Sequence, residues 1–229
     1  MNAPSLTKID QPPVTLRDMV QDKLREAIIE GVFQPGERLV ERPLCDQLGV
    51  SRTVIRETIR FLEAEGLVEL LPGRGPIVAN ITLADARQIY DIRRMLETAA
   101  AGACAAAITP DQIKVLNAAL RALKSEFRHK KPGGVVRASN AFYAEIFAGA
   151  GHHIAWEVVQ RLNGRISRLR MLTLGSNKRD RPGIEHMNAI CTAIVTKDAE
   201  AAKHAVTRHL DDAAATAERV LAQEVIHDG

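Results

Sequence analysis

One stretch of this chain, residues 41–79, limits what the N-terminal part can fold into. If Ser51 is an N-cap and each residue after it turns the helix by about 100°, the apolar and charged side chains separate onto two sides. A shorter helix over residues 42–48 precedes this one, and Gly49 supplies the turn between them. This is the spacing of a helix-turn-helix, whose second helix contacts DNA through its N-terminal residues. The buried side is expected to hold Val54, Ile55, Thr58, Ile59, Phe61 and Leu62. The solvent-exposed side is expected to hold Arg52, Thr53, Arg56, Glu57, Arg60 and Glu63.

The residues after this helix predict a β-hairpin wing. Gly66 ends the helix, and apolar runs at residues 67–71 and 77–79 flank the turn Pro72-Gly73-Arg74-Gly75. The glycines beside Arg74 remove side-chain bulk, so the arginine can approach a phosphate or a minor groove closely. We therefore predict a winged helix-turn-helix over residues 15–80, preceded by a flexible arm over residues 1–14.

This part of the chain resembles the DNA-binding domain of GntR-type bacterial transcription regulators. The matching runs are IIEGVFQPGERL at residues 28–39, ERxL at 41–44, LGVSRTxxRE at 48–57 and LEAEGLV at 62–68. The sequence departs from the family at Val54, where proline is most common, and a first-turn helix position tolerates either residue. By this resemblance the DNA-contacting residues are Arg42, Ser51, Arg52, Thr53, Arg56, Gly73 and Arg74.

These DNA contacts divide into two kinds. Arg52 and Arg56 are expected to read base edges, because an arginine bidentate to guanine discriminates by about 1 to 3 kcal/mol. Arg42, Ser51 and Arg74 are expected to hold phosphates. The alternative for the two helix arginines is a surface ion pair with Glu57 or Glu63.

Composition and charge set wider limits. Hydrophobic residues make up 46% of the chain and aromatic residues 3%, which favours an ordered, mainly α-helical protein. Residues 1–80 carry 10 Lys and Arg against 12 Asp and Glu, so DNA binding has to depend on where the arginines lie and on two copies acting together. Three widely spaced cysteines, no secretion signal and no membrane span predict a cytoplasmic protein without disulfides. The need for two DNA-binding copies predicts a homodimer.

Residues 81–229 predict an antiparallel all-α bundle of about six helices. Thr82 and Asp85 form a capping-box pattern at the start of the first helix, and Pro110 is placed to begin the second. Residues 130–134 read as a loop. The other helices are expected over residues 110–127, 135–148, 154–174, 182–196 and 198–224.

This second part is similar to the FCD ligand-binding domain that follows the winged helix in the FadR subfamily. The matching runs are YDIRRMLE at residues 90–97, FYAEIFAGAG at 142–151 and AICTAIVTKDAEAA at 189–202. The resemblance implies a small-molecule effector and, in many members, a divalent metal held by Asp or Asn and three His. Those four positions fall here on Ser139, Tyr143, Met187 and His209.

Serine, tyrosine and methionine are poor ligands for zinc, nickel or manganese. We therefore expect no cofactor and a metal-free effector pocket in which Tyr143 and His209 supply hydrogen bonds. A shifted metal site formed by Asn140, His186 and His209 is the competing hypothesis. Arg93 either faces the pocket and anchors an acidic effector, or only pairs with Glu97 one helical turn away.

No catalytic motif occurs in the sequence, so an enzyme is not predicted. The sequence favours a regulator, most simply a repressor, that binds operator DNA and is controlled by a small metabolite such as an organic acid. Two alternatives stay open. One is a DNA-binding protein that responds to no effector, and the other is a metabolite-binding or enzymatic helical module without DNA function.

Overall fold

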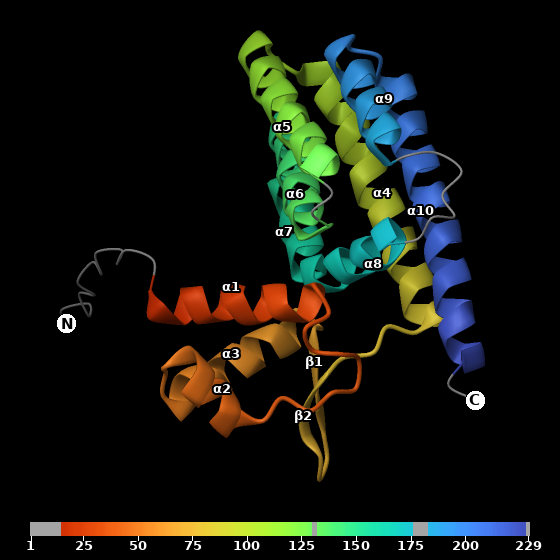
Figure 1. Cartoon of the computed structure of the whole chain (residues 1–229). Helices are drawn as coiled ribbons and strands as arrows, with labels where there is room; N and C mark the ends of the chain where they lie inside the picture. Colours follow the sequence, from red (N-terminus) through yellow and green to blue (C-terminus); the bar gives the residue numbers. More distant parts are fainter. Residues whose placement is uncertain (1–14, 130–131, 176–182, 228–229) are drawn as a thin grey trace, which may run out of the picture.

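The computed structural model describes residues 15–129, 132–175 and 183–227. It is mainly helical, with one two-stranded antiparallel sheet near the N-terminus (Figure 1). The predicted arm over residues 1–14 lies outside the described residues. The N-terminal elements are α1 (Leu16–Ile29), α2 (Glu41–Leu48), α3 (Arg52–Ala64), β1 (Val68–Leu71) and β2 (Gly75–Val78). The helices that follow are α4 (Leu83–Ala107), α5 (Pro110–His129), α6 (Pro132–Gly149), α7 (His153–Arg161), α8 (Asn163–Gly175), α9 (Gly183–Val195) and α10 (Ala199–His227).

The first five elements form the predicted winged helix-turn-helix around a core of their own. Ser51 caps α3 by accepting a hydrogen bond from the Val54 amide, and Gly49 ends α2 in the left-handed conformation that glycine tolerates. The strands β1 and β2 pair in the register Val68 with Val78. This core consists of Val20, Leu24, Ile28, Leu39, Leu44, Ile55, Ile59, Leu62, Leu67, Val68 and Val78.

The helices α4 to α10 pack around a second core that starts at Ile81. The two longest helices, α4 and α10, run side by side and antiparallel along the length of this domain (Figure 1). Their facing surfaces are rich in small buried residues, which allow the two backbones to approach closely. No described helix is long and apolar enough to span a bilayer.

Three expectations about elements and packing need correction. Residues 154–174 do not form one helix, because α7 ends at Arg161 with Leu162 as its C-cap and α8 starts at Asn163. This gives seven helices after the wing in the described part of the chain. Helix α6 starts at Pro132 inside the predicted loop, because proline is tolerated at the first helical position. Phe61 is 38% exposed rather than core, and the Arg25 guanidinium lies 5.6 Å from its ring centroid.

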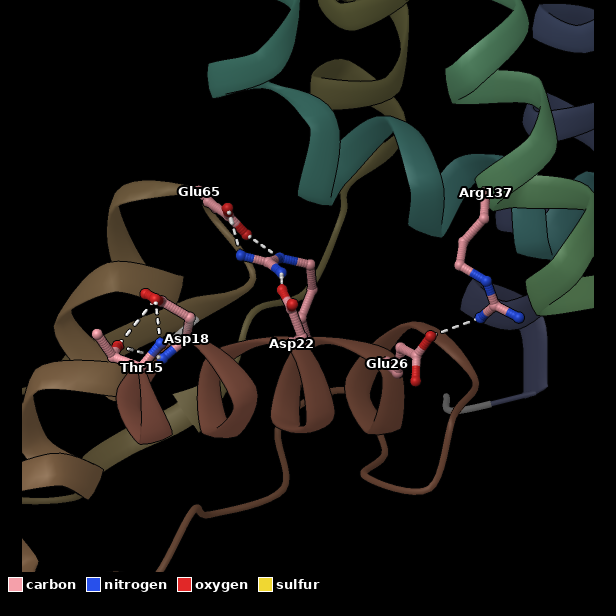
Figure 2. A network of polar contacts seen from close by, with 7 residues as sticks. Thr15, Asp18, Asp22, Glu26, Glu65 and Arg137 are labelled. Atoms are coloured by element: carbon pink, nitrogen blue, oxygen red, sulfur yellow. Dashed lines mark hydrogen bonds and ion pairs between the residues drawn. The ribbon is translucent and has the colours of Figure 1, made fainter. Parts of the chain in front are cut away.

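Helix α1 lies between the recognition helix α3 and the helical domain (Figure 1). Arg25 of α1 forms a two-bond ion pair with Glu65 at the end of α3, with distances of 2.8 Å from Nε to Oε2 and 3.0 Å from Nη2 to Oε1. The next residue, Glu26, pairs with Arg137 of α6, at 2.5 Å between Oε1 and Nη1 (Figure 2). Two adjacent residues of α1 therefore form ion pairs with different parts of the protein: Arg25 with the end of α3 and Glu26 with α6 of the helical domain.

Candidate functional site

The recognition helix presents its polar residues to solvent. Ser51, Arg52, Thr53 and Arg56 are all exposed, while Ile55, Thr58, Ile59 and Leu62 on the opposite side are buried. Arg42 is exposed near the start of α2. The Ser51 oxygen is engaged in capping the helix, and its hydroxyl proton can still be donated to a phosphate. These residues form a surface that can enter a major groove.

Arg56 is held in place by a residue that the sequence did not single out. Its Nε donates to Oε1 of Glu41 at 2.8 Å, so the partner is Glu41 of α2 rather than Glu57 or Glu63. This hydrogen bond and the carboxylate charge raise the pKa of Arg56 above its ordinary value. Because only Nε is used, the two terminal amino groups of the guanidinium can still contact a guanine.

The wing turn has the backbone that its glycines permit. Gly73 and Gly75 have φ of 76° and 77°, and the Arg74 amide donates to the Leu71 carbonyl at 3.1 Å. Arg74 is exposed at the tip. Arg38 adds a single antiparallel bridge to Ile77, so the loop before α2 braces the wing from one side.

A second candidate site lies inside the helical domain. It is a cavity of about 30 Å³, which has room for about one water molecule. Arg93, Ser139, Met187 and His209, all expected to line the effector pocket, do line it. The other lining residues come from α5, α6, α8, α9 and α10, and they are Phe127, Val135, Arg170, Thr173, Leu174, Gly183 and Ala213.

Arg93 lines this cavity and also pairs with Glu97 on the same helix. Both side chains are 1% exposed, and Arg93 donates from Nε to Oε1 at 2.7 Å and from Nη2 to Oε2 at 3.3 Å. Burial is the largest single effect and acts to lower the pKa of Arg93, but the Glu97 carboxylate together with Tyr90 and Tyr143 raises the pKa above its ordinary value. Arg93 therefore stays charged inside the domain.

Arg170 is the second cationic group of the cavity, and sequence analysis did not assign it there. Burial and the neighbouring charge of Arg93 lower the pKa of Arg170 to about 10. Its guanidinium lies 5.6 Å from the Tyr143 ring centroid and donates a hydrogen bond to the Asn140 side-chain oxygen. Glu97 is hydrogen-bonded to Arg93, and its charge also acts on Arg170. The two guanidiniums in the cavity lining favour an anion there.

The remaining candidates surround the cavity without lining it. Tyr143 is buried and its ring stacks at 6.5 Å on that of His209, while burial and the Glu97 charge raise the Tyr143 pKa well above its usual value. The His186 ring lies 5.4 Å from that of His209, and its Nε2 is 3.4 Å from Asp212 Oδ2. Asn140 lies one layer further out, between Arg170 and Ser167.

The side chains at the family's metal positions do not suit a divalent cation. Only His209 retains a ligand side chain, and the cavity in front of it contains the guanidiniums of Arg93 and Arg170. In the shifted alternative, the oxygen of Asn140 already accepts a hydrogen bond from Arg170, which is unfavourable for a second cation at that oxygen. Within residues 15–129, 132–175 and 183–227, no three His, Cys, Asp or Glu side chains are grouped to hold a metal ion.

An exposed recognition helix and wing, joined to a helical domain with a charged internal cavity, define a DNA-binding protein with a sensor domain. Residues 16–78 match the family described as bacterial regulatory proteins, gntR family, and residues 88–212 match the FCD domain. The chain belongs to the GntR family of transcription regulators, in the group that carries a C-terminal FCD domain. The matching families and relatives are regulators rather than enzymes.

Similar proteins span nearly the whole chain. The transcriptional repressor RspR of Escherichia coli strain K12 is 25% identical over 201 residues, covering 88% of each chain. A GntR regulator from Rhodococcus sp. RHA1 has a solved structure with a TM-score of 0.75 and 25% identity, over 88% of this chain and 96% of that one. The structure of E. coli McbR has the same fold, with a TM-score of 0.76, 22% identity, and coverage of 93% and 100%.

Proposed function

We propose that this protein is a cytoplasmic, homodimeric repressor of the FadR subfamily whose operator binding is controlled by an organic acid. The observation that carries the effector class is the presence of two guanidiniums, Arg93 and Arg170, in the lining of the cavity. A carboxylate placed between the two guanidiniums would form charge-assisted hydrogen bonds with both. The repressor assignment is supported by the relative named as a repressor, RspR.

On DNA, two copies would place their recognition helices in successive major grooves. The half-sites of a palindromic operator would then lie about 34 Å apart or a multiple of it. Arg52 and Arg56 would read bases, while Arg42, Ser51, Thr53, Gly73 and Arg74 would contact the backbone or approach it closely. All of these residues are exposed, which supports their contact with DNA.

In the helical domain the effector would bind without a metal. Since the cavity measures about 30 Å³, an organic acid has to widen it on entry. Widening gives the ligand different affinities for two arrangements of the domain, which is the condition for any ligand to shift an equilibrium.

The test combines both sites in the full-length protein. Duplexes are selected from a random pool at low salt, and carboxylic acids are then screened for release of the selected duplex, with the corresponding neutral amides as controls. Arg52→Ala with Arg56→Ala should abolish duplex binding and leave the thermal midpoint unchanged. Arg170→Met should abolish the response to the acid. A protein that binds no duplex at low salt, or an acid response that survives Arg170→Met, contradicts the proposal.

A further inference from the structure

Helix α8 reaches from the effector cavity to the end of the recognition helix. It has 13 residues and is therefore about 20 Å long. Near its C-terminal end, Arg170, Thr173 and Leu174 line the cavity. Near its N-terminal end, Gly164 and Arg165 contact residues 65–67, which follow α3. The two sites therefore lie at opposite ends of one helix.

The start of α8 packs against the winged domain at Gly164. A Cβ atom at this position would lie 2.6 Å from Leu67 Cγ and 3.0 Å from the Glu65 carbonyl oxygen. Only glycine allows so close an approach of the α8 backbone to the residues between α3 and β1. The contact leaves little space for relative movement of the two segments.

Arg165 adds a charged contact at the same place. Its guanidinium occupies the space where a Cβ of Gly66 would be, directly after the C-terminal end of α3. The free carbonyls at that helix end carry partial negative charge, which favours a cation there. Arg165 is also near the start of α4. Hydrogen bonds from Thr82 lower the pKa of Asp85, and the charge of Arg165 acts in the same direction.

Polar contacts link the cavity end of α8 to α6 and to its own first turn. Arg170 donates to the Asn140 oxygen, and the Asn140 amide nitrogen lies 3.4 Å from Ser167 Oγ. Ser167 Oγ in turn lies 3.4 Å from Asn163 Oδ1. The break at Leu162 separates α8 from α7, and the two helices run in different directions (Figure 1). Arg170 is thus hydrogen-bonded to α6, whereas the contacts with the end of α3 are made by Gly164 and Arg165 of α8 itself.

We propose that α8 transmits the state of the effector cavity to the recognition helix, with Arg170 as the sensing residue and Gly164 and Arg165 as the contacts that position α3. An anion bound between Arg93 and Arg170 competes with Asn140 for the Arg170 guanidinium. Loss of that hydrogen bond weakens the attachment of the cavity end of α8 to α6, and the resulting shift of α8 reaches Glu65, Gly66 and Leu67 at the end of α3. This route rests on the proposed function, because it assumes that the cavity binds an anion.

A double-mutant cycle tests this route without knowledge of the effector. Arg170→Met, Arg165→Ala and the double variant are compared with the wild-type full-length protein for the Kd of the duplex selected by the wild type, at one fixed salt concentration. We expect each single variant to change Kd in the same direction by about fivefold or more, the lower end of typical couplings. The double variant should change it no further than the larger single effect. Arg161→Ala, at an exposed arginine of α7, should combine additively with Arg170→Met.

Hydrogen exchange gives a second readout that does not need DNA. Asn140→Ala, which removes the acceptor of Arg170 without emptying the cavity, should speed amide exchange in residues 61–67 and leave residues 52–56 unchanged. Additive effects in the cycle, or unchanged exchange in residues 61–67 for both Arg170→Met and Asn140→Ala, would overturn the route through α8. A wild-type protein that binds no duplex refutes the proposed function instead, and the exchange experiment still decides whether α8 couples the two regions.

Discussion

Arg52 and Arg56 of the winged domain are exposed to solvent, whereas Arg93 of the helical domain is 1% exposed and paired with Glu97. The exposed arginines lie on one short helix and keep donors available for a partner outside the molecule. The buried arginine depends on a carboxylate one turn away and on the packing of surrounding helices. The same side chain therefore serves recognition in one domain, while in the other it is part of the folded core, so substitutions should separate the two uses.

The largest expected effect is on the buried pair. Glu97→Gln keeps the shape of the side chain but leaves Arg93 and Arg170 without their shared carboxylate. Breaking a buried pair by removing one partner costs about 3–5 kcal/mol. Thermal and denaturant unfolding measure this loss. The control is Glu218→Gln, whose exposed pair with Arg87 should contribute less than about 1 kcal/mol. Equal costs for the two variants would mean that the Glu97 pair gains nothing from burial.

Two matched helix caps give a smaller effect and compare the domains directly. Thr15 and Thr82 form the same capping box, with Asp18 in the winged domain and Asp85 in the helical domain. Thr82→Ala should cost about 1 kcal/mol and speed hydrogen exchange in residues 83–107. Thr15→Ala should act on residues 16–29 instead. If either variant loosened both segments equally, the two domains would be unfolding as one unit.

The pH dependence of these caps follows from their carboxylates. Hydrogen bonds from Thr15 and Thr82 lower the pKa of Asp18 and Asp85 in the folded state. The stabilisation is therefore complete above the unfolded pKa of about 4 and is lost as the pH falls through the lower folded values. The difference between wild type and Thr82→Ala should shrink below pH 4 in thermal unfolding. A difference that is constant from pH 7 to pH 3 would exclude a contribution from Asp85.

The smallest effect is expected at Glu41, and it concerns specificity rather than stability. Glu41→Gln keeps a hydrogen-bond acceptor for Arg56 Nε but removes the charge that orients the guanidinium. Duplex affinity should fall severalfold, with weaker discrimination at one base position in each half-site and an unchanged unfolding midpoint. The control is Glu57→Gln, at a residue that lies on the same helix as Arg56 and pairs with Arg17. Unaltered discrimination in Glu41→Gln would mean that Arg56 does not depend on Glu41.

The two domains also differ in how far their sequence predicts them. The winged helix-turn-helix was predicted because its signals are local: a capping serine, glycines at left-handed positions, and a helix with two distinct sides. Glu41 was missed because its contact with Arg56 joins two helices across the turn, which helix periodicity does not show. Phe61 was placed in the core because helix periodicity shows toward which side of the helix a residue points, but not whether another element covers that side.

In the helical domain the class of fold could be predicted from the sequence, but only part of the cavity could. Arg93 and His209 were assigned to it in advance, whereas Arg170 was not. Its position follows from the break at Leu162, and the close contact of Gly164 with Leu67 is a tertiary feature that hydrophobic periodicity does not reveal. The cavity is lined by six helices, so its shape depends on contacts between residues that are far apart in the sequence.

The alanine-rich contact between α4 and α10 has a consequence for evolution within this architecture. Ala100, Ala101 and Ala105 of α4 and Ala202, Ala205 and Ala217 of α10 are all buried, and small residues that bring two backbones together leave no room for larger ones. This pair of helices is therefore the least replaceable part of the domain. Residues on α6, α8 and α9 that face the cavity are free of that restriction. A change of effector can thus arise by substitution on those three helices while the frame that supports them is kept.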